Sequence, residues 1–236
     1  MCTVSFVNIN GTIILTSNRD EKTIRPAAIA PKNYRINHKN VFFPKDKKGG
    51  GTWFAVNENA AVLILLNGAA EKHVPKSSYR KSRGLIVLEL ISKTSVISAW
   101  HDLDLENIEP FTLVLYENEN LYQLQWNDVE KSTIKLDDTK SHIWSSSTLY
   151  SSEIRKERAN WFKDFLANNE ELTAEKLSDF HTNTKKENTD YGLVINRNNE
   201  MQTLSVTQTV IDKNKVKISY NDLIADKVVT NAFITI

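Results

Sequence analysis

Short apolar runs separated by turn residues dominate the first third of the chain. Residues 3–7 and 12–16 flank Asn10-Gly11, a pair that tolerates positive φ, so this segment is predicted to form a β-hairpin. Residues 52–56 and 60–66 form a second pair of predicted strands. The run 60–66 is apolar on both faces, which indicates a strand in a buried sheet.

The rest of the chain alternates β-type runs with helical patterns. Residues 25–48 contain Pro26, Pro31 and Pro44 and are expected to form a long irregular connection. Helices are predicted at residues 82–93, 151–167 and 173–180. Further strands are predicted at residues 111–116, 121–126, 142–146, 191–195, 201–210, 216–220 and 232–236. With no internal repeat and no linker, the pattern predicts one α+β domain over residues 1–236.

The composition limits the kinds of partner. The chain has 30 Lys and Arg against 29 Asp and Glu, so its formal net charge of +1 provides no global field for nucleic acid. The longest apolar run, residues 60–66, is much shorter than the roughly 20 residues of a membrane helix. Polar residues also interrupt the N-terminal stretch, where a secretory signal needs an apolar core. A cytoplasmic globular protein is therefore expected, with no nucleic-acid partner and no integral membrane contact.

The single cysteine, Cys2, excludes a disulfide within the chain and any zinc site that needs two cysteines. The five histidines show no metal-ligand spacing, so no metal and no cofactor are expected; only His142 is a minor candidate for a functional role. Removal of Met1 would leave Cys2 with a thiol and a free α-amino group, whose ordinary pKa of roughly 7.7–8.0 suits a base. Cys2 is then a candidate nucleophile, and its alternative role is that of a small apolar residue at the start of a strand.

A polar cluster, Asn18-Arg19-Asp20-Glu21, comes just after the second predicted strand. Such a run is usually a solvated turn, but the hairpin would also bring it back to Cys2. The carboxylate of Asp20 can orient an amine, and the guanidinium of Arg19 favours a thiolate. These residues are therefore candidates for the same site as Cys2.

Two glycine-containing turns carry further candidate chemistry. Gly49-Gly50-Gly51-Thr52-Trp53 lacks the phosphate-cradling pattern, so its glycines indicate close backbone approach or a mobile rim. Trp53 is expected in the core or in a pocket wall. Asn67-Gly68 directly follows a buried strand, where it is typical of a tight turn. In the alternative, the Asn67 amide donates to an oxyanion.

Five motifs follow one another along roughly the first 90 residues. They are Met1-Cys2-Thr3, Ser17-Asn18-Arg19-Asp20-Glu21, Gly50-Gly51-Thr52-Trp53, Leu65-Leu66-Asn67 and Ser82-Arg83-Gly84. Their order and spacing resemble the NRDE family, which includes the transport-and-Golgi-organisation-2 proteins. Looser matches at residues 142–149 and in the C-terminal strands extend the resemblance over the full length.

The resemblance implies an α+β N-terminal-nucleophile hydrolase fold, a four-layer αββα sandwich with two stacked antiparallel sheets. It is similar to the choloylglycine hydrolases and to the acyl-coenzyme A:6-aminopenicillanic acid acyltransferases. On this resemblance the Cys2 thiolate attacks a small amide or thioester, and its own amine shuttles the proton. Arg19 and Asp20 hold the amine and thiol, and Asn67 stabilises the oxyanion. The implied supporting residues are Asn18, Glu21, Trp53 and Ser146.

Three features depart from the pattern of these hydrolases. Ser146 occupies the place of a second asparagine, and Leu204 that of a late arginine. Arg19 and Asp20 are adjacent, whereas the hydrolases space this pair differently. The departures favour a second hypothesis, a non-catalytic carrier of haem or an acyl lipid on the same fold. Both hypotheses imply a small-molecule partner, which is an acyl amide, a thioester or haem, and both leave the oligomeric state open.

Overall fold

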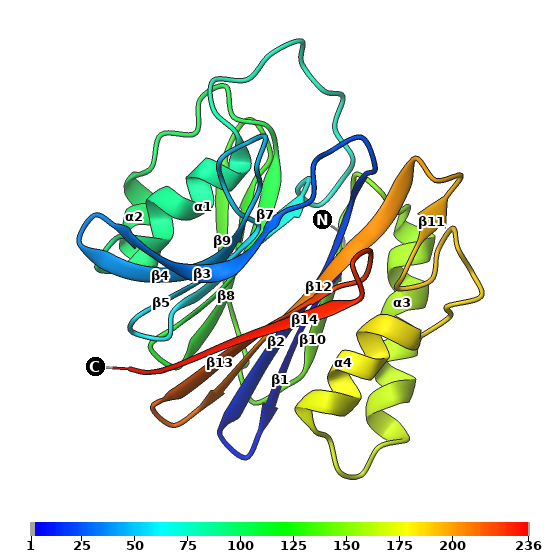
Figure 1. Ribbon diagram of the computed structural model, residues 1–236. Coiled ribbons are helices and arrows are strands. Elements are labelled where there is room, and N and C mark those ends of the chain that lie inside the picture. Colours follow the sequence, from blue (N-terminus) through cyan, green and yellow to red (C-terminus); the bar gives the residue numbers. More distant parts are fainter. Residues whose placement is uncertain (1–2, 236) are drawn as a thin grey trace.

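The computed structural model describes residues 3–235, so the predicted nucleophile Cys2 lies outside the described residues, together with Met1. The described chain forms two stacked seven-stranded sheets, each with two helices on its outer face (Figure 1). All strand pairs in both sheets are antiparallel. The αββα sandwich expected from the resemblance is therefore confirmed.

The elements divide between the sheets as follows. The first sheet contains, in spatial order, β10 (His142–Ser145), β1 (Thr3–Ile9), β2 (Thr12–Lys22), β12 (Met201–Asp212), β13 (Lys215–Asp222) and β14 (Lys227–Ile234), with β11 (Asn196–Arg197) paired to β12. The second contains β3 (Ile29–Ile36), β4 (Lys39–Lys45), β5 (Phe54–Asn57), β6 (Val62–Asn67), β7 (Phe111–Glu117), β8 (Asn120–Trp126) and β9 (Lys131–Leu136). The helices are α1 (Arg83–Ile91), α2 (Val96–Asp102), α3 (Ser152–Ala167) and α4 (Ala174–Asn183).

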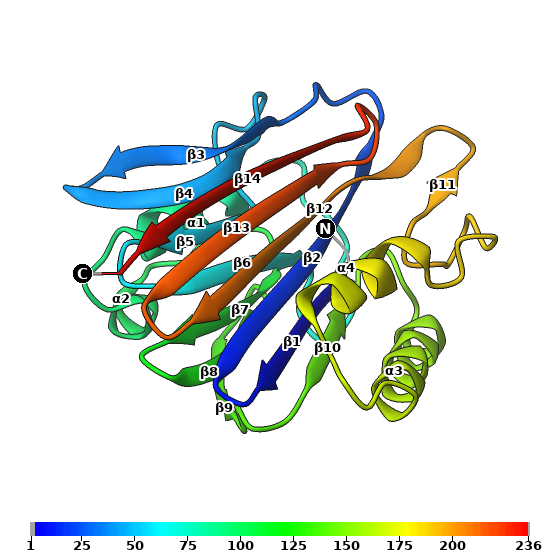
Figure 2. The same ribbon diagram turned by 60° about the horizontal axis from the view of Figure 1, so that its bottom comes forward.

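The N-terminal hairpin is buried on both faces, because the second sheet covers one face and helices cover the other. Val4 and Phe6 belong to the core between the sheets, whereas Val7 and Ile14 pack with Phe162 of α3. This double burial explains why β1 and β2 contain apolar residues on both faces. Figure 2 shows β10, β1 and β2 beside α3 and α4, whereas β13 and β14 extend beyond the helices. None of the described helices is long and apolar enough to cross a membrane.

The predicted helices form close to the expected residues. Thr173 caps α4 by accepting a hydrogen bond from the backbone of Lys176 at 3.2 Å, and Ser151 caps α3 in the same way at Ile154. Ser82 occupies the N-cap position of α1, but its side chain accepts no capping hydrogen bond.

The prediction of an irregular connection over residues 25–48 is wrong, because this segment contains β3 and β4. Pro31 does not prevent pairing, since β3 lies at the edge of its sheet and the register shifts between Ile29 and Lys32.

The predicted strand at residues 191–195 is also wrong. Leu193 and Ile195 are buried, but the segment forms no strand, so its apolar residues reflect burial and not pairing. Besides β3 and β4, three elements lie outside the predictions, namely α2, β9 and β11. Helix α2 is only seven residues long, and β9 is a mainly exposed polar strand at a sheet edge.

Candidate functional site

The tetrapeptide Asn18-Arg19-Asp20-Glu21 lies within β2, so its predicted position after the strand is wrong. The strand continues because β12 pairs with it as far as Lys22. The register of this pair shifts between Thr203 and Ser205, opposite Asp20 and Arg19. Leu204, expected in place of a late arginine, is the extra residue of this irregularity. A bulge of this kind redirects side chains next to a site.

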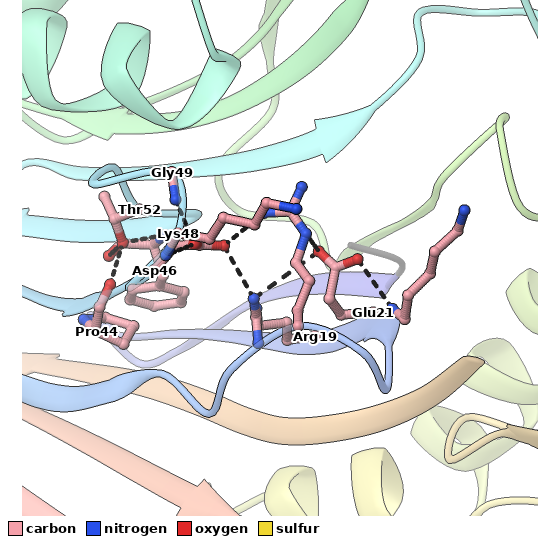
Figure 3. A network of polar contacts seen from close by, with 10 residues as sticks. Arg19, Glu21, Pro44, Asp46, Lys48, Gly49 and Thr52 are labelled. Atoms are coloured by element: carbon pink, nitrogen blue, oxygen red, sulfur yellow. Dashed lines mark hydrogen bonds and ion pairs between the residues drawn. The ribbon is translucent and has the colours of Figure 1, made fainter. Parts of the chain in front are cut away.

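Arg19 points into the space between the sheets (Figure 3). Its side chain is 2% exposed, and its Nη2 lies 3.2 Å from Oδ2 of Asp46 and 3.8 Å from Oε2 of Glu21. The guanidinium carbon lies 4.3 Å from the ring centroid of Trp53, which is a cation–π distance. Nη1 of Arg19 is buried and makes no hydrogen bond to any described residue. Arg19 is therefore a fixed cation with one unused donor group.

Asp46 forms ion pairs with two arginines and accepts hydrogen bonds from the turn that follows it. Its Oδ2 also lies 3.0 Å from Nη1 of Arg25, and its Oδ1 accepts from the backbone of Lys48 (2.8 Å) and Gly49 (2.7 Å). Burial alone would raise the pKa of Asp46. The Gly49 hydrogen bond and the guanidinium groups of Arg25 and Arg19 outweigh burial, and the pKa is lowered. Asp46 is thus held in its charged form.

Two of the sequence motifs meet at their glycines. The backbone of Thr52 donates to the oxygen of Gly84 at 3.1 Å. A Cβ on Gly51 would lie 2.3 Å from the carbonyl carbon of Gly84, so the two backbones are in direct contact. Gly51 therefore serves close approach, one of the two roles expected from the sequence, whereas Gly50 has open space around it and a φ of +70°.

A Gly51→Ala substitution is expected to destabilise the fold by about 1–3 kcal/mol, because the added methyl group would overlap the Gly84 backbone. The matched control is Gly49→Ala, since a Cβ there would meet only Asp46 at 3.6 Å. Urea denaturation of both variants measures the difference. Equal stability of the Gly51 and Gly49 variants would contradict the packing argument.

A cavity of about 400 Å³ opens beside Arg19 and is bordered by both motif loops. Its lining carries four cations and three carboxylates, a formal balance of 4 − 3 = +1. The cations are Arg19, Lys22, Arg25 and Arg83, and the carboxylates are Glu21, Asp46 and Glu109. Arg83 lies 2.8 Å from Glu109 and donates to the backbone oxygen of Pro110. Burial lowers the pKa of Arg83, and Glu109 opposes this shift.

Asn67 also lines this cavity, at the end of β6. Its backbone oxygen accepts a hydrogen bond from Oγ of Ser146 at 2.7 Å, and the same hydroxyl lies 2.9 Å from Oγ1 of Thr148. Ser146 borders a second cavity of about 410 Å³, whose lining includes Trp144 and Gln125. Asn67 and Ser146 therefore stand between two cavities.

Asp20 lies on the opposite face of β2 from Arg19, because successive strand residues alternate in direction. It is buried, and its Oδ2 accepts from the hydroxyl of Tyr150 at 2.8 Å. Its Oδ1 accepts from Oγ1 of Thr203 at 2.5 Å. Asp20 therefore ties β2 to β12 and to the segment between β10 and α3.

Asn18 shares the face of Asp20 and holds β2 to α4. Its Nδ2 donates to the backbone oxygens of His181 (2.9 Å) and Leu193 (2.8 Å), and its Oδ1 bonds to Nδ1 of His181. The other ring nitrogen of His181 lies 2.7 Å from Oγ of Ser5 on β1. This buried network fastens both strands of the first hairpin to the helical layer.

The structure thus separates the predicted site residues into two groups. One group surrounds the charged cavity and consists of Arg19, Glu21, Trp53 and Asn67, with Ser146 next to Asn67. The other group, Asn18 and Asp20, faces the helices. His142 is remote from both groups, since it pairs with Phe6 at the opposite end of β10 from Ser145. Among the described residues, no group of His, Cys, Asp and Glu has an arrangement that would hold a metal ion.

No role was predicted from the sequence for Asp46, Arg25, Arg83 or Glu109. Only two of these carried a signal: Arg83 lies in the Ser82-Arg83-Gly84 motif, and Asp46 precedes the glycine run by three residues. An Asp at that spacing commonly accepts hydrogen bonds from the turn that follows.

Replacing Arg19 by leucine is expected to lower the free energy of unfolding by about 3–5 kcal/mol, because it removes a buried cation and leaves the partly buried Asp46 with one cation fewer. Arg25→Leu removes the other guanidinium from the same carboxylate, but this side chain is 37% exposed. Its loss is expected to cost about 1 kcal/mol or less. Chemical denaturation of the two variants tests the contrast, and a similar loss in both would contradict it.

Two stacked antiparallel sheets between helical layers, with the first strand paired on both sides within its sheet, define an N-terminal-nucleophile hydrolase fold. The family model for Transport and Golgi organisation 2 matches residues 1–221. The chain therefore belongs to the Transport and Golgi organisation 2 family, in agreement with the motifs in the sequence.

Solved structures support the same fold at low sequence identity. A Caenorhabditis elegans N-acylethanolamine-hydrolyzing acid amidase ortholog aligns with a TM-score of 0.61 and 10% identity, over 88% of this chain and 92% of its own. A mutant conjugated bile acid hydrolase from Clostridium perfringens aligns with a TM-score of 0.55 and 11% identity, over 99% and 92% of the two chains. No match is found among proteins of curated function.

Proposed function

We propose that the protein is an N-terminal-cysteine amidohydrolase or acyltransferase, which acts on a small amide or thioester through Cys2 after removal of Met1. The observation that carries this proposal is the position of Thr3. Thr3 is buried and pairs with Asn18 on one side and with Ser145 on the other. Arg19 directly follows Asn18 in the chain, and Ser146 directly follows Ser145. Adjacent Cα atoms are about 3.8 Å apart. Thr3, the residue bonded to Cys2, thus lies in the sheet beside the neighbours of Arg19 and of Ser146.

The proposed reaction has two steps. The Cys2 thiolate attacks the carbonyl carbon, a C–S bond forms, and the C–N or C–S bond of the substrate breaks. The thiol proton passes through the α-amine to the leaving group. Water then cleaves the thioester in a hydrolase, or an acceptor amine or thiol takes the acyl group in a transferase. Asn67 is proposed to donate to the carbonyl oxygen, on which negative charge develops.

The named activities of two structural neighbours support an amide substrate. One is an N-acylethanolamine-hydrolyzing amidase and the other hydrolyses conjugated bile acids, according to their descriptions. A third solved structure, an arginine-to-leucine variant of the bile acid hydrolase, aligns with a TM-score of 0.50 and 10% identity. The alignment covers 99% of this chain and 92% of the hydrolase chain. A cytoplasmic location would suit the proposal, because a reducing compartment keeps the thiol free.

The second candidate function is a non-catalytic carrier of haem or an acyl lipid. The residue at position 146 favours it, because the side chain of Ser146 is a shorter donor than the asparagine of similar hydrolases. Its hydroxyl also donates to the backbone oxygen of Asn67. This group is already engaged within the protein. The carrier hypothesis needs the cavity but not the thiol.

The test is to trap the covalent intermediate. Protein whose intact mass shows Met1 removal is mixed with a panel of activated acyl esters and amides, quenched in acid and measured again by mass. The proposal expects one acyl group per chain, located on Cys2. Mature protein that forms no adduct and turns over no amide, yet binds haem or acyl-coenzyme A, would select the carrier.

A further inference from the structure

Helix α1 begins at the edge of the charged cavity, and its first turn is uncapped. Ser82, Arg83 and Gly84 line the cavity, and the Ser82 side chain accepts no capping hydrogen bond. The first turn has no acidic residue, and the backbone N–H groups of Arg83 and Gly84 make no hydrogen bond within the described chain. The hydrogen bond from Thr52 to Gly84 fixes this helix end against the neighbouring loop. An uncapped helix N-terminus carries roughly half a positive charge and attracts anions.

Two buried side chains that line the same cavity have donor groups without an acceptor. They are Arg19 and Trp53, each 2% exposed. Nη1 of Arg19 and Nε1 of Trp53 make no hydrogen bond with a described residue. The guanidinium carbon lies 4.3 Å from the indole ring centroid, so the two donors belong to one pair of stacked groups. Both groups can only donate, and a buried donor without a partner is costly, so the pair calls for an acceptor.

The charges around the cavity indicate which acceptor would fit. Its three carboxylates, Glu21, Asp46 and Glu109, each form an ion pair with an arginine of the cavity wall. Lys22, which also lines the cavity, forms no ion pair with a described residue. One positive charge therefore remains in excess. A singly charged anion would balance it, whereas a phosphate group, with a charge of roughly −1.5 to −2, would reverse it.

We propose that the cavity contains a carboxylate-binding subsite, formed by the N-terminus of α1 and the free N–H groups of Arg19 and Trp53. A carboxylate has one negative charge and two acceptor oxygens, and it can accept from several donors at once. Asn67, the proposed donor to the substrate carbonyl, lines the same cavity of about 400 Å³. The substrate is then a small amide or thioester that also carries one carboxylate. This assignment of the substrate rests on the proposed function, whereas carboxylate binding can be measured without turnover.

The experiment is equilibrium binding, measured by calorimetry at pH 7 and low salt. The probes are short-chain N-acylglycines, each paired with its neutral N-acylglycinamide, and inorganic phosphate at the same ionic strength. The acids are expected to bind about tenfold or more tightly than the matched amides, and more tightly than phosphate. Equal affinity for acid and amide would overturn the inference, and so would tighter binding of phosphate. Selective binding of the acids by protein that turns over no amide would uphold the subsite and reject the proposed function.

Trp53→Phe removes the free N–H group and keeps an aromatic ring beside Arg19. Because this N–H has no acceptor within the described chain, the variant is expected to keep its stability to urea, yet to bind the acids about tenfold more weakly. The matched control is Trp126→Phe, which lies outside the cavity lining and whose N–H donates to the Ile108 oxygen at 2.8 Å. This control should lose stability and keep the native affinity.

Native affinity for the acids in Trp53→Phe would overturn the inference, as would an equal loss of affinity in Trp53→Phe and Trp126→Phe. The contrast between acid and amide in the native protein decides the case even if Trp53→Phe does not fold. Lys22→Gln provides a third variant at an exposed position. It should weaken binding of the acids and leave binding of the amides unchanged, because it removes only the excess charge.

Discussion

In the Cys2→Ala variant, turnover of any amide or thioester substrate is expected to fall by roughly 10³-fold or more. The substitution removes the only thiol of the chain, and with it the atom that we propose forms the acyl intermediate. The measurement is steady-state hydrolysis by native and variant proteins, both with Met1 removal verified by mass. Thr3 and its partners lie within the fold, so the variant should keep the native stability.

Cys2→Ser is the matched control, because it retains a nucleophilic atom of weaker reactivity. Slow turnover with a stable ester on Ser, and none with Ala, would support nucleophilic catalysis. Undiminished turnover in Cys2→Ala would reject it. Binding of haem or acyl-coenzyme A that is unchanged in Cys2→Ala, in protein that turns over no amide, would favour the carrier.

Acidification is expected to remove about 3 kcal/mol of stability between pH 7 and pH 4 through His181 alone. The pKa of this residue is about 3 in the fold, because of burial and the Arg158 charge, against an ordinary value of 6.5. As the pH falls, the unfolded chain protonates this histidine at a higher pH than the folded protein does, and protonation therefore favours unfolding. Stability is therefore complete above about pH 6.5 and is lost progressively as the pH falls towards 3.

The measurement is urea denaturation across this range. Because carboxylates also titrate at the acid end, the contribution of His181 is the difference between the native protein and His181→Gln, which should lack the pH dependence above pH 5. His101→Gln, at an exposed histidine of α2, should behave as the native protein does. A native-like slope in His181→Gln would show that other groups cause the acid sensitivity.

The sequence allowed the fold to be predicted where local patterns and tertiary packing agree. The hairpin around Asn10-Gly11 and the capped helix α4 are local features, and both form where expected. The prediction for residues 25–48 failed because prolines favour irregular structure locally, whereas the edge position of β3 tolerates Pro31.

The site was predictable in its motifs but not in its partners. Arg19 and Trp53 each belong to a motif recognised in the sequence, and they form a cation–π contact in the fold. Asp46 is a long-range partner, because it reaches β2 from a distant segment. Single side chains brought together by tertiary folding leave no periodic signal in the sequence.

The alternation of Asn18-Arg19-Asp20-Glu21 across β2 affects how this tetrapeptide should be used in comparing relatives. Its even-numbered residues bind α4 and Tyr150, so the architecture alone would select for them. Arg19 is also fixed by Asp46 whether or not a reaction takes place. Members of the family that had lost catalysis would therefore still be under pressure to retain the motif. Its presence in a genome identifies the fold, and activity must be assigned from the terminal cysteine and from measured chemistry.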